Sequence, residues 1–331
     1  MPFDTTSGPI GVVGAGSWGT ALAIVAARAG RPVVLWGRDA AQIEAMAALR
    51  ENVRYLPGMP LPDEVQPIAA LTGLADAEAL VLAVPAQRLR EICSGLPATA
   101  PLVICAKGLE QATGLRLSEV VAAERPGAAI AVLSGPSFAM EVAQGLPTAV
   151  TIAAADQTLA QSLALLLASP GFRPYPSDDL LGVELAGALK NVVAIAAGVT
   201  MGKGLGENAR ASLITRGLAE LTRLALALGA RRETLMGLAG LGDLLLTATS
   251  LTSRNTSFGH AMAQGRTASD LMASGQKLSE GAFTAEAACH LGRRFGVELP
   301  IAEAVRAIVA GETSVDAAIE ALLARPLPPT E

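Results

Sequence analysis

Residues 9–19 read PIGVVGAGSWG, a short apolar run that ends in three glycines spaced as GxGxxG. An alanine-rich stretch follows over residues 20–29, and residues 31–36 form a second apolar run. Strand, GxGxxG turn, helix and strand is the order of the dinucleotide-binding βαβ unit. The glycines allow a tight turn and the close approach of a pyrophosphate to a helix N-terminus. They are Gly14, Gly16 and Gly19. The alternative is a glycine-rich turn that binds nothing.

The end of the second run bears on the choice of cofactor. It reads Trp36-Gly37-Arg38-Asp39. NAD sites carry an acidic residue here, which binds the ribose, whereas NADP sites have an arginine nearby. Arg38 is placed to pair with a 2′-phosphate, and Asp39 is suited to cap the next helix. The sequence favours NADP and leaves NAD open; the alternative is that Arg38 is an ordinary surface arginine.

Polar residues follow several further apolar runs of the first half. Residues 80–85 end in Pro85, residues 102–106 are followed by Lys107, and residues 129–133 by Ser134-Gly135-Pro136-Ser137. In an open parallel sheet, ligands bind at the carboxyl ends of the strands, so these residues are expected to line a crevice. Lys107 taken alone is equally an ordinary loop lysine. Residues 52–67 are proline-containing and predict a loop.

Strand signals stop after residue 177. Residues 148–153 and 172–175 are the last β-rich runs, and glycine-separated helical patterns follow. The sequence therefore predicts an α/β fold, with a Rossmann-type doubly wound sheet in residues 1–177 and an all-α domain in residues 178–331.

One helix of the second half carries a charge in an apolar setting. Residues 184–198 read ELAGALKNVVAIAAG, which is apolar on every face apart from Glu184, Lys190 and Asn191. A lysine in a core helix must reach water, find a partner or lose its proton. The last course makes a lysine a general base, so Lys190 is a catalytic candidate. Snorkelling to the surface is the alternative.

Two polar clusters in the second half are further candidates. Asp243 and Thr247 lie four residues apart and share a face if their segment is helical. Ser253, Arg254 and Asn255 together suit phosphate binding through charge-assisted hydrogen bonds. The alternatives are a helix cap for Asp243 and a polar loop for the second cluster.

Composition excludes several classes of protein. The 331 residues are 51% hydrophobic and 17% charged, with a net charge of −5, which opposes disorder and general nucleic-acid binding. Three scattered cysteines and two histidines predict no metal site and no disulfide framework. Because no uninterrupted membrane-length apolar run is present, and residues 1–8 lack a basic signal region, we expect a cytoplasmic protein without membrane insertion. The apolar helices of the second half favour a homodimer.

Taken together, these motifs resemble the bacterial NAD(P)-dependent glycerol-3-phosphate dehydrogenase family. The similarity runs over residues 9–315, and its order and spacing fit throughout. The matching motifs are GAGSWGTALA (14–23), LWGRD (35–39), VPAQ (84–87), AKGLE (106–110), SGPSFAMEVAQGLPTA (134–149), GALKNVVAIAAG (187–198), NARASLITRGLAE (208–220), AGLGDLLLT (239–247), SRNTSFG (253–259) and SEGAFTA (279–285).

The resemblance implies reversible reduction of dihydroxyacetone phosphate to sn-glycerol 3-phosphate with NADPH or NADH, for phospholipid synthesis. It implies cofactor contacts from Ser17, Trp18, Arg38, Lys107, Ala139, Arg254, Leu278 and Glu280. It implies Lys190 as proton donor and acceptor, supported by Asp243. It implies a substrate site formed by Lys107, Gly135, Ser137, Lys190, Asp243, Thr247, Ser253, Arg254 and Asn255. Arg38 stands where many members have histidine, and Ser137 where many have threonine.

The proton transfer that this reaction requires is compatible with a lysine as the proton donor. Hydride addition to a ketone leaves an alkoxide that needs a proton. His260 and His290 lie in segments without other chemical signals. Desolvation and Lys107 would lower the pKa of Lys190, whereas an ionised Asp243 would oppose that shift. Two rivals remain: a hydroxyacid or ketopantoate reductase, which would lack the Ser-Arg-Asn cluster, and a silent nucleotide sensor, which would not need a buried lysine.

Overall fold

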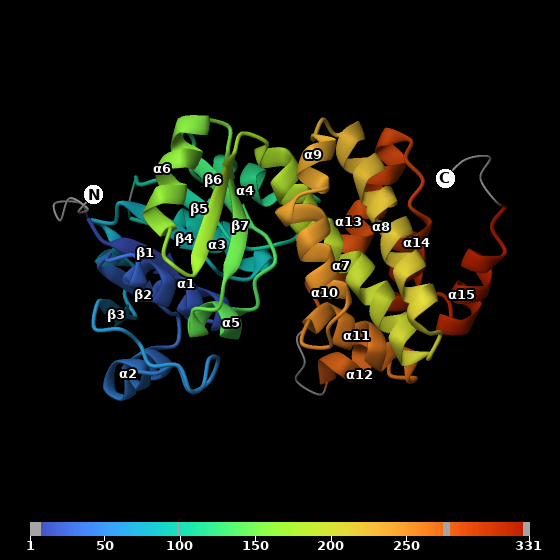
Figure 1. Cartoon of the computed structure of the whole chain (residues 1–331), viewed down its shortest axis with the longest axis horizontal. Helices are drawn as coiled ribbons and strands as arrows, with labels where there is room; N and C mark the ends of the chain where they lie inside the picture. Colours follow the sequence, from blue (N-terminus) through green and yellow to red (C-terminus); the bar gives the residue numbers. More distant parts are fainter. Residues whose placement is uncertain (1–7, 98, 274–278, 327–331) are drawn as a thin grey trace. The chain divides into compact units, whose positions relative to one another are not determined.

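The computed structural model describes residues 8–97, 99–273 and 279–326. The chain divides into two compact units, residues 1–184 and residues 185–331. The first is a sheet covered by helices and the second is built from helices (Figure 1). A Rossmann-type N-terminal sheet followed by a helical C-terminal region confirms the predicted fold class.

The first unit is organised around an eight-stranded sheet in the order β3-β2-β1-β4-β5-β6-β7-β8. Neighbouring strands from β3 through to β6 run parallel, β7 is antiparallel to β6, and β8 is parallel to β7. The parallel arrangement brings the carboxyl ends of β1, β4, β5 and β6 to one edge, as predicted. The strands are β1 Ile10–Val13, β2 Val33–Trp36, β3 Val65–Ile68, β4 Ala79–Leu82, β5 Leu102–Ile104, β6 Ile130–Ser134, β7 Thr148–Ala154 and β8 Phe172–Ser177.

Strand β3 corrects one prediction, because it lies in the stretch 52–67 that was expected to be a loop. Its Pro67 pairs with Leu35 of β2, and β3 is the first strand in the sheet order, at one edge of the sheet. A proline lacks the N–H group that a central strand needs, but an edge strand tolerates it. The proline was therefore evidence for an edge position, not against a strand.

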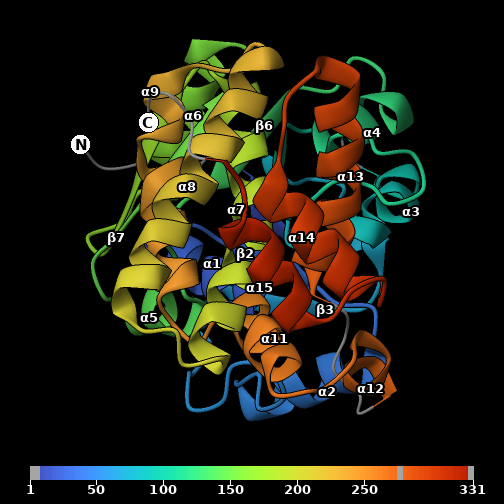
Figure 2. The same cartoon turned by 90° about the vertical axis from the view of Figure 1, so that its right-hand side faces the viewer.

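Helices cover both faces of the sheet. Helices α1, α5 and α6 pack together on one face, and α3 and α4 lie on the other (Figures 1 and 2). Helix α1 is almost wholly buried, and with the strands it forms the main apolar core of this unit. The helices are α1 Ser17–Arg28, α2 Ala40–Leu49, α3 Leu89–Ser94, α4 Leu117–Glu124, α5 Ala139–Gln144 and α6 Gln157–Leu167, with short 3₁₀ turns at Leu71–Leu74 and Ala86–Arg88.

The second unit contains only helices among its described residues. Helix α7, Leu180–Gly202, begins in the first unit and continues through the second. The others are α8 Glu207–Ala227, α9 Arg232–Leu235, a π-helical turn at Leu238–Gly242, α10 Asp243–Ala248, α11 Arg254–Ala263, α12 Ala268–Ala273, α13 Glu280–Phe295, α14 Pro300–Val309 and α15 Val315–Leu323.

Helix α7 is the buried helix that the sequence indicated. Asp179 caps its start by accepting a hydrogen bond from the Gly182 N–H at 2.9 Å. Its length and apolar composition would suit a membrane span, but 89% of the apolar window is buried inside the protein. In this structure α7 is a core helix.

Glycines allow α7 and α11 to cross at backbone contact. A Cβ atom on Gly198 of α7 would collide with the Thr256 carbonyl oxygen, and one on Gly259 of α11 would collide with the Ile195 carbonyl oxygen. Helix axes approach this closely only where side chains are absent. The crossing fixes α11 against the helix that carries Lys190.

Buried glutamates cap two other helices. Glu220 of α8 accepts hydrogen bonds from the Ile301 N–H at 3.0 Å and from the Ala302 N–H at 3.4 Å, at the start of α14. Burial raises the pKa of Glu220 to about 7, although these two N–H groups act in the opposite direction. Glu184 caps α4 in the same way, accepting from the Ser118 N–H at 2.7 Å, and burial raises its pKa too.

Substitution Gly198→Ala should destabilise the protein. The added methyl group must move the backbone of α11, and overpacking of this kind costs about 1–3 kcal/mol. Chemical unfolding measures the loss. Gly95→Ala is the control, because its Cβ would lie 3.5 Å from the nearest atom, at an ordinary negative φ of −96°. Equal stability of the two variants would contradict the backbone-contact crossing.

Glu220 should make stability depend on pH. Its folded pKa lies above its ordinary value of 4.5, so between about pH 4.5 and 7 the folded state holds a proton that the unfolded chain has released. The free energy of unfolding should therefore fall as pH rises through this window, by at most about 1.4 kcal/mol per pH unit.

Urea unfolding of Glu220→Gln and of wild type across this pH window isolates the contribution of Glu220 to the pH dependence, because Glu184 titrates in both proteins. The free energy of unfolding of the variant should change less steeply with pH. Glu303→Gln, an exposed carboxylate in the first turn of α14, should leave the slope unchanged. A Glu220→Gln slope equal to that of wild type would mean that burial does not hold the proton on Glu220.

Candidate active site

Each glycine of the glycine-rich turn after β1 has a different structural role. Gly14 has a φ of +116°, and a Cβ there would lie 2.8 Å from the Ala83 carbonyl oxygen. A Cβ on Gly19 would collide with the Gly14 carbonyl oxygen, so Gly19 lets α1 pack onto the turn. A Cβ on Gly16 would meet no atom within 4 Å. The first and third glycines therefore serve the fold, and the second faces open space.

This turn fits the pyrophosphate of a dinucleotide. Gly16 is the N-cap of α1, and this N-cap position has no side-chain cap hydrogen bond. Uncapped N–H groups and the helix dipole attract an anion, and the missing Cβ of Gly16 leaves room for it. The geometry of this turn is therefore compatible with an anionic ligand.

The other predicted cofactor residues of the first unit surround this turn and the end of β2. The Ser17 hydroxyl donates to the Tyr55 carbonyl at 2.7 Å, and Trp18 is half-buried against the core. Arg38 is exposed after β2. Asp39 caps α2, because its Oδ1 accepts from the Gln42 N–H at 3.3 Å. The cap proposed for Asp39 from the sequence is therefore present.

The ends of β5 and β6 bring a second set together. The Lys107 Nζ donates to the Gly135 carbonyl at 3.3 Å, and the Ser137 hydroxyl donates to the same oxygen at 3.0 Å. Gly135 has a φ of +151°, and a Cβ there would lie 2.8 Å from the Val150 Cα. The backbone conformation and the close approach of Val150 thus require a glycine at position 135. Ala139 follows as the first residue of α5.

The loop that carries Lys107 is held by a residue that sequence reasoning did not select. The Gln87 side-chain amide donates to the Leu109 carbonyl and accepts from the Gln111 N–H, each at 2.9 Å. An amide that bonds the backbone twice fixes the loop two residues beyond Lys107. The only sequence signal was the place of Gln87 in the VPAQ motif.

Lys190 lies at the centre of the polar cluster in the second unit. Its side chain is 7% exposed, and its Nζ lies 2.5 Å from Asp243 Oδ1 and 2.7 Å from Thr247 Oγ1. Asp243 and Thr247 lie on one face of α10, as their spacing predicted, and both are buried. Lys190 therefore meets its need for a partner inside the protein and does not snorkel to the surface.

A π-helical turn sets the position of Asp243. The Gly242 N–H bonds the Gly237 carbonyl at 3.1 Å, and α10 begins at the next residue. A Cβ on Gly240 would collide with the Leu235 carbonyl oxygen. Turns of this kind often occur at functional sites, where they re-aim a side chain.

Helix α11 presents the Ser-Arg-Asn cluster at its N-terminus. Ser253 is the N-cap, with its hydroxyl accepting from the Thr256 N–H at 3.4 Å, so this part is a cap and not a loose loop. Arg254 is exposed in the first turn. The Thr256 hydroxyl donates to the Thr247 carbonyl at 2.6 Å, which joins this helix end to the Lys190 cluster.

Asn255 links three helices. Its Nδ2 donates to Asn191 Oδ1 of α7 at 2.9 Å, and its Oδ1 accepts from the Gly281 N–H of α13 at 3.0 Å and from the Ser279 hydroxyl. Glu280, a predicted cofactor residue, is the first residue of α13. Leu278 lies outside the described residues.

Several of these contacts could not be read from the sequence. Asn191 and Thr256 join elements across the fold, and Asn52 does the same in the first unit. Their only signal is a polar residue within an apolar or structured stretch. Among the residues that the structure describes, no group of His, Cys, Asp and Glu side chains could hold a metal ion.

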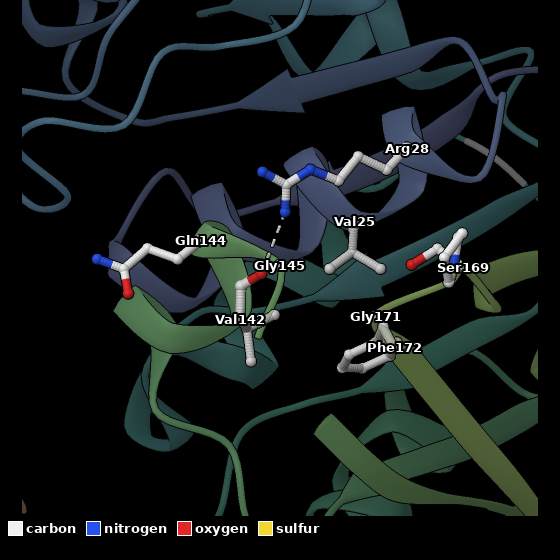
Figure 3. Close-up of a pocket in the computed structure, with 9 residues that line it drawn as sticks. Val25, Arg28, Val142, Gln144, Gly145, Ser169, Gly171 and Phe172 are labelled. Atoms are coloured by element: carbon white, nitrogen blue, oxygen red, sulfur yellow. Dashed lines mark hydrogen bonds between the residues drawn. The ribbon is translucent and has the colours of Figure 1, made fainter. Parts of the chain in front are cut away.

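A pocket of about 410 Å³ lies in the first unit, and none of the predicted site residues lines it (Figure 3). The C-terminal end of α1, the end of α5 and the turn before β8 surround it. Its one charged lining residue, Arg28, donates from Nη1 to the Val142 carbonyl at 3.4 Å. Val25 and Phe172 form apolar parts of the wall, and no set of reactive groups converges there.

Comparison with known proteins identifies the family. The family models for the N-terminus and the C-terminus of NAD-dependent glycerol-3-phosphate dehydrogenase match residues 9–160 and 179–320. The chain is 53% identical over 321 residues to a glycerol-3-phosphate dehydrogenase [NAD(P)+] from Parvibaculum lavamentivorans, covering 96% of each chain. It is 55% identical over 324 residues to the Methylobacterium radiotolerans protein of the same name, covering 96% of this chain and 97% of that one.

A solved structure agrees in fold. Glycerol-3-phosphate dehydrogenase from Coxiella burnetii matches with a TM-score of 0.91 at 38% identity, over 96% of this chain and 99% of that one. The matched ranges span both units. The chain belongs to the NAD(P)-dependent glycerol-3-phosphate dehydrogenase family.

Proposed function

We propose that the chain reduces dihydroxyacetone phosphate to sn-glycerol 3-phosphate, reversibly, with Lys190 as the general acid and base. The observation that carries this proposal is the buried Lys190 Nζ, 2.5 Å from Asp243 Oδ1 and 2.7 Å from Thr247 Oγ1. A silent nucleotide sensor would gain nothing from such a costly arrangement, because burying a charged pair brings no dependable stability.

Proton transfer is the task of Lys190. When bound, the reduced nicotinamide supplies the hydride. The substrate oxygen then needs a proton, which the Lys190 ammonium donates from Nζ, and the resulting neutral amine regains a proton from solvent. In the oxidative direction the neutral amine accepts the hydroxyl proton. Asp243 and Thr247 hold Nζ in place throughout, and the Asp243 carboxylate favours the proton-loaded form needed for reduction.

The phosphate group of the substrate is assigned to the N-terminus of α11. Arg254 is exposed there, on a ten-residue helix whose first N–H groups attract anions. A guanidinium can bind a phosphate through two parallel hydrogen bonds. Ser253 and Asn255 contribute by holding the helix end, since Ser253 caps it and Asn255 ties it to α7 and α13.

The cofactor is assigned to the first unit. Gly16 and the uncapped start of α1 would hold the pyrophosphate. Arg38 would pair with a 2′-phosphate, which favours NADP, and Lys107 would act at the end of β5 beside Gly135 and Ser137. The proposed enzyme is a cytoplasmic homodimer, for which the apolar helices of the second half are the support, and its proposed role is to supply glycerol 3-phosphate for phospholipid synthesis.

Replacing Lys190 should abolish the proton transfer. Lys190→Ala should lower kcat for dihydroxyacetone phosphate by about 10²–10⁴-fold, the usual contribution of a general acid. Steady-state oxidation of the reduced cofactor measures it. Lys203→Ala is the matched control, since Lys203 directly follows α7 and also pairs with an aspartate, Asp316, at 2.5 Å. A Lys190→Ala variant with wild-type turnover would overturn the assignment.

Replacing Arg254 should remove the preference for a phosphorylated substrate. Arg254→Ala should raise KM for dihydroxyacetone phosphate by about tenfold or more, which is the loss expected for a charge-assisted contact. The kcat/KM for unphosphorylated dihydroxyacetone should change little. Arg216→Ala, at an exposed arginine of α8, is the control. Equal losses with both ketones would show that Arg254 does not read the phosphate.

A further inference from the structure

The segment after α2 is fastened to the glycine-rich turn. Asn52 is fully buried, and its Nδ2 donates to the Ala15 carbonyl at 3.1 Å and to the Thr20 hydroxyl at 2.7 Å. Three residues later, the Tyr55 carbonyl accepts from the Ser17 hydroxyl at 2.7 Å. Because Ala15 and Ser17 belong to the dinucleotide turn, this segment forms a fixed wall beside it.

Arg54 lies between these two attachment points and faces the end of β2. Its Nη1 lies 3.2 Å from Asp39 Oδ2, and its guanidinium carbon lies 5.1 Å from the centre of the Tyr55 ring. The side chains of Arg54 and Asp39 are 61% and 49% exposed. Arg54 is thus held at this edge by the segment, while its charged end remains reachable from solvent.

Asp39 therefore has one arginine next to it in the sequence and a second paired with it, at the point where a Rossmann fold recognises the adenosine ribose. Arg38 directly precedes Asp39 in the chain, and Arg54 forms an ion pair with Asp39. An acid at this point suits a 2′-hydroxyl and repels a 2′-phosphate, whereas an arginine suits the phosphate. Asp39 alone would oppose the 2′-phosphate that Arg38 is assigned to bind. Arg54 neutralises it.

We propose that Arg54 is a second specificity-determining residue for the 2′-phosphate of NADP, exchanging its Asp39 partner for the phosphate. When the ribose carries a 2′-hydroxyl, the Arg54–Asp39 ion pair remains intact and Asp39 accepts a hydrogen bond from the hydroxyl. When it carries a 2′-phosphate, Arg54 turns to the phosphate beside Arg38. This inference rests on the proposed role of Arg38 in the same subsite.

Binding of two small ligands to the free enzyme tests the proposed role of Arg54 independently of catalysis. Adenosine 2′,5′-bisphosphate and 5′-AMP differ only in the 2′-phosphate, and titration calorimetry gives Kd for each. Arg54→Ala should weaken the bisphosphate about tenfold or more and change 5′-AMP by less than about twofold. Asp39→Asn keeps the cap of α2, because asparagine caps as well as aspartate, and should tighten the bisphosphate.

Matched variants separate this inference from the role of Arg38. Arg88→Ala, which breaks an exposed Arg88–Glu91 pair elsewhere in the first unit, should leave both probes unchanged. If Arg38→Ala weakens the bisphosphate selectively and both Arg54→Ala and Arg54→Gln do not, the Arg54 inference is wrong and the Arg38 proposal stands. If none of these variants affects the bisphosphate selectively, both are wrong. Equal weakening of the two probes by Arg54→Ala would also overturn the inference.

Discussion

A lysine inside an apolar helix needs an opposite charge, and Lys190 has one in Asp243, with its Nζ and Oδ1 atoms 2.5 Å apart. Taking both charges out of water is costly, and the pair repays that cost only with good geometry and further hydrogen bonds. Thr247 supplies one of those hydrogen bonds. Helix α10 must therefore begin at one particular place, and the π-helical turn before Asp243 provides it.

Close backbone packing connects the Lys190–Asp243 pair to the rest of the second unit. Gly198 and Gly259 let α7 and α11 touch, and the hydroxyl of Thr256 ties α11 to α10. Asn255 then joins α11 to α7 and α13. The groups assigned to the phosphate and to the proton are thus held by the same few contacts. A substitution at one of these contacts should therefore alter the effect of a substitution at another.

Local signals in the sequence predicted much of this arrangement. The GxGxxG turn, the apolar runs of the parallel strands and the four-residue spacing of Asp243 and Thr247 are local patterns, and the elements they predicted are present. Strand β3 was missed because Pro67 suggests a loop, and only the sheet order reveals its edge position. The roles of Asn52 and Gln87 were missed because both bond residues distant in sequence. Ser253 belongs to the predicted phosphate-binding cluster, for which a polar loop was the alternative, and its role as a helix cap becomes clear only once α11 is known.

The central claim is that Lys190 transfers the proton, and the pH dependence of a single turnover tests it most directly. With saturating dihydroxyacetone phosphate and reduced cofactor, the wild-type rate of hydride transfer should fall as pH rises and the Lys190 ammonium is lost. The reverse reaction should show the opposite trend. In Lys190→Ala the rate should be low, and the falling limb should disappear. The same falling limb in the variant, at an undiminished rate, would show that another group supplies the proton.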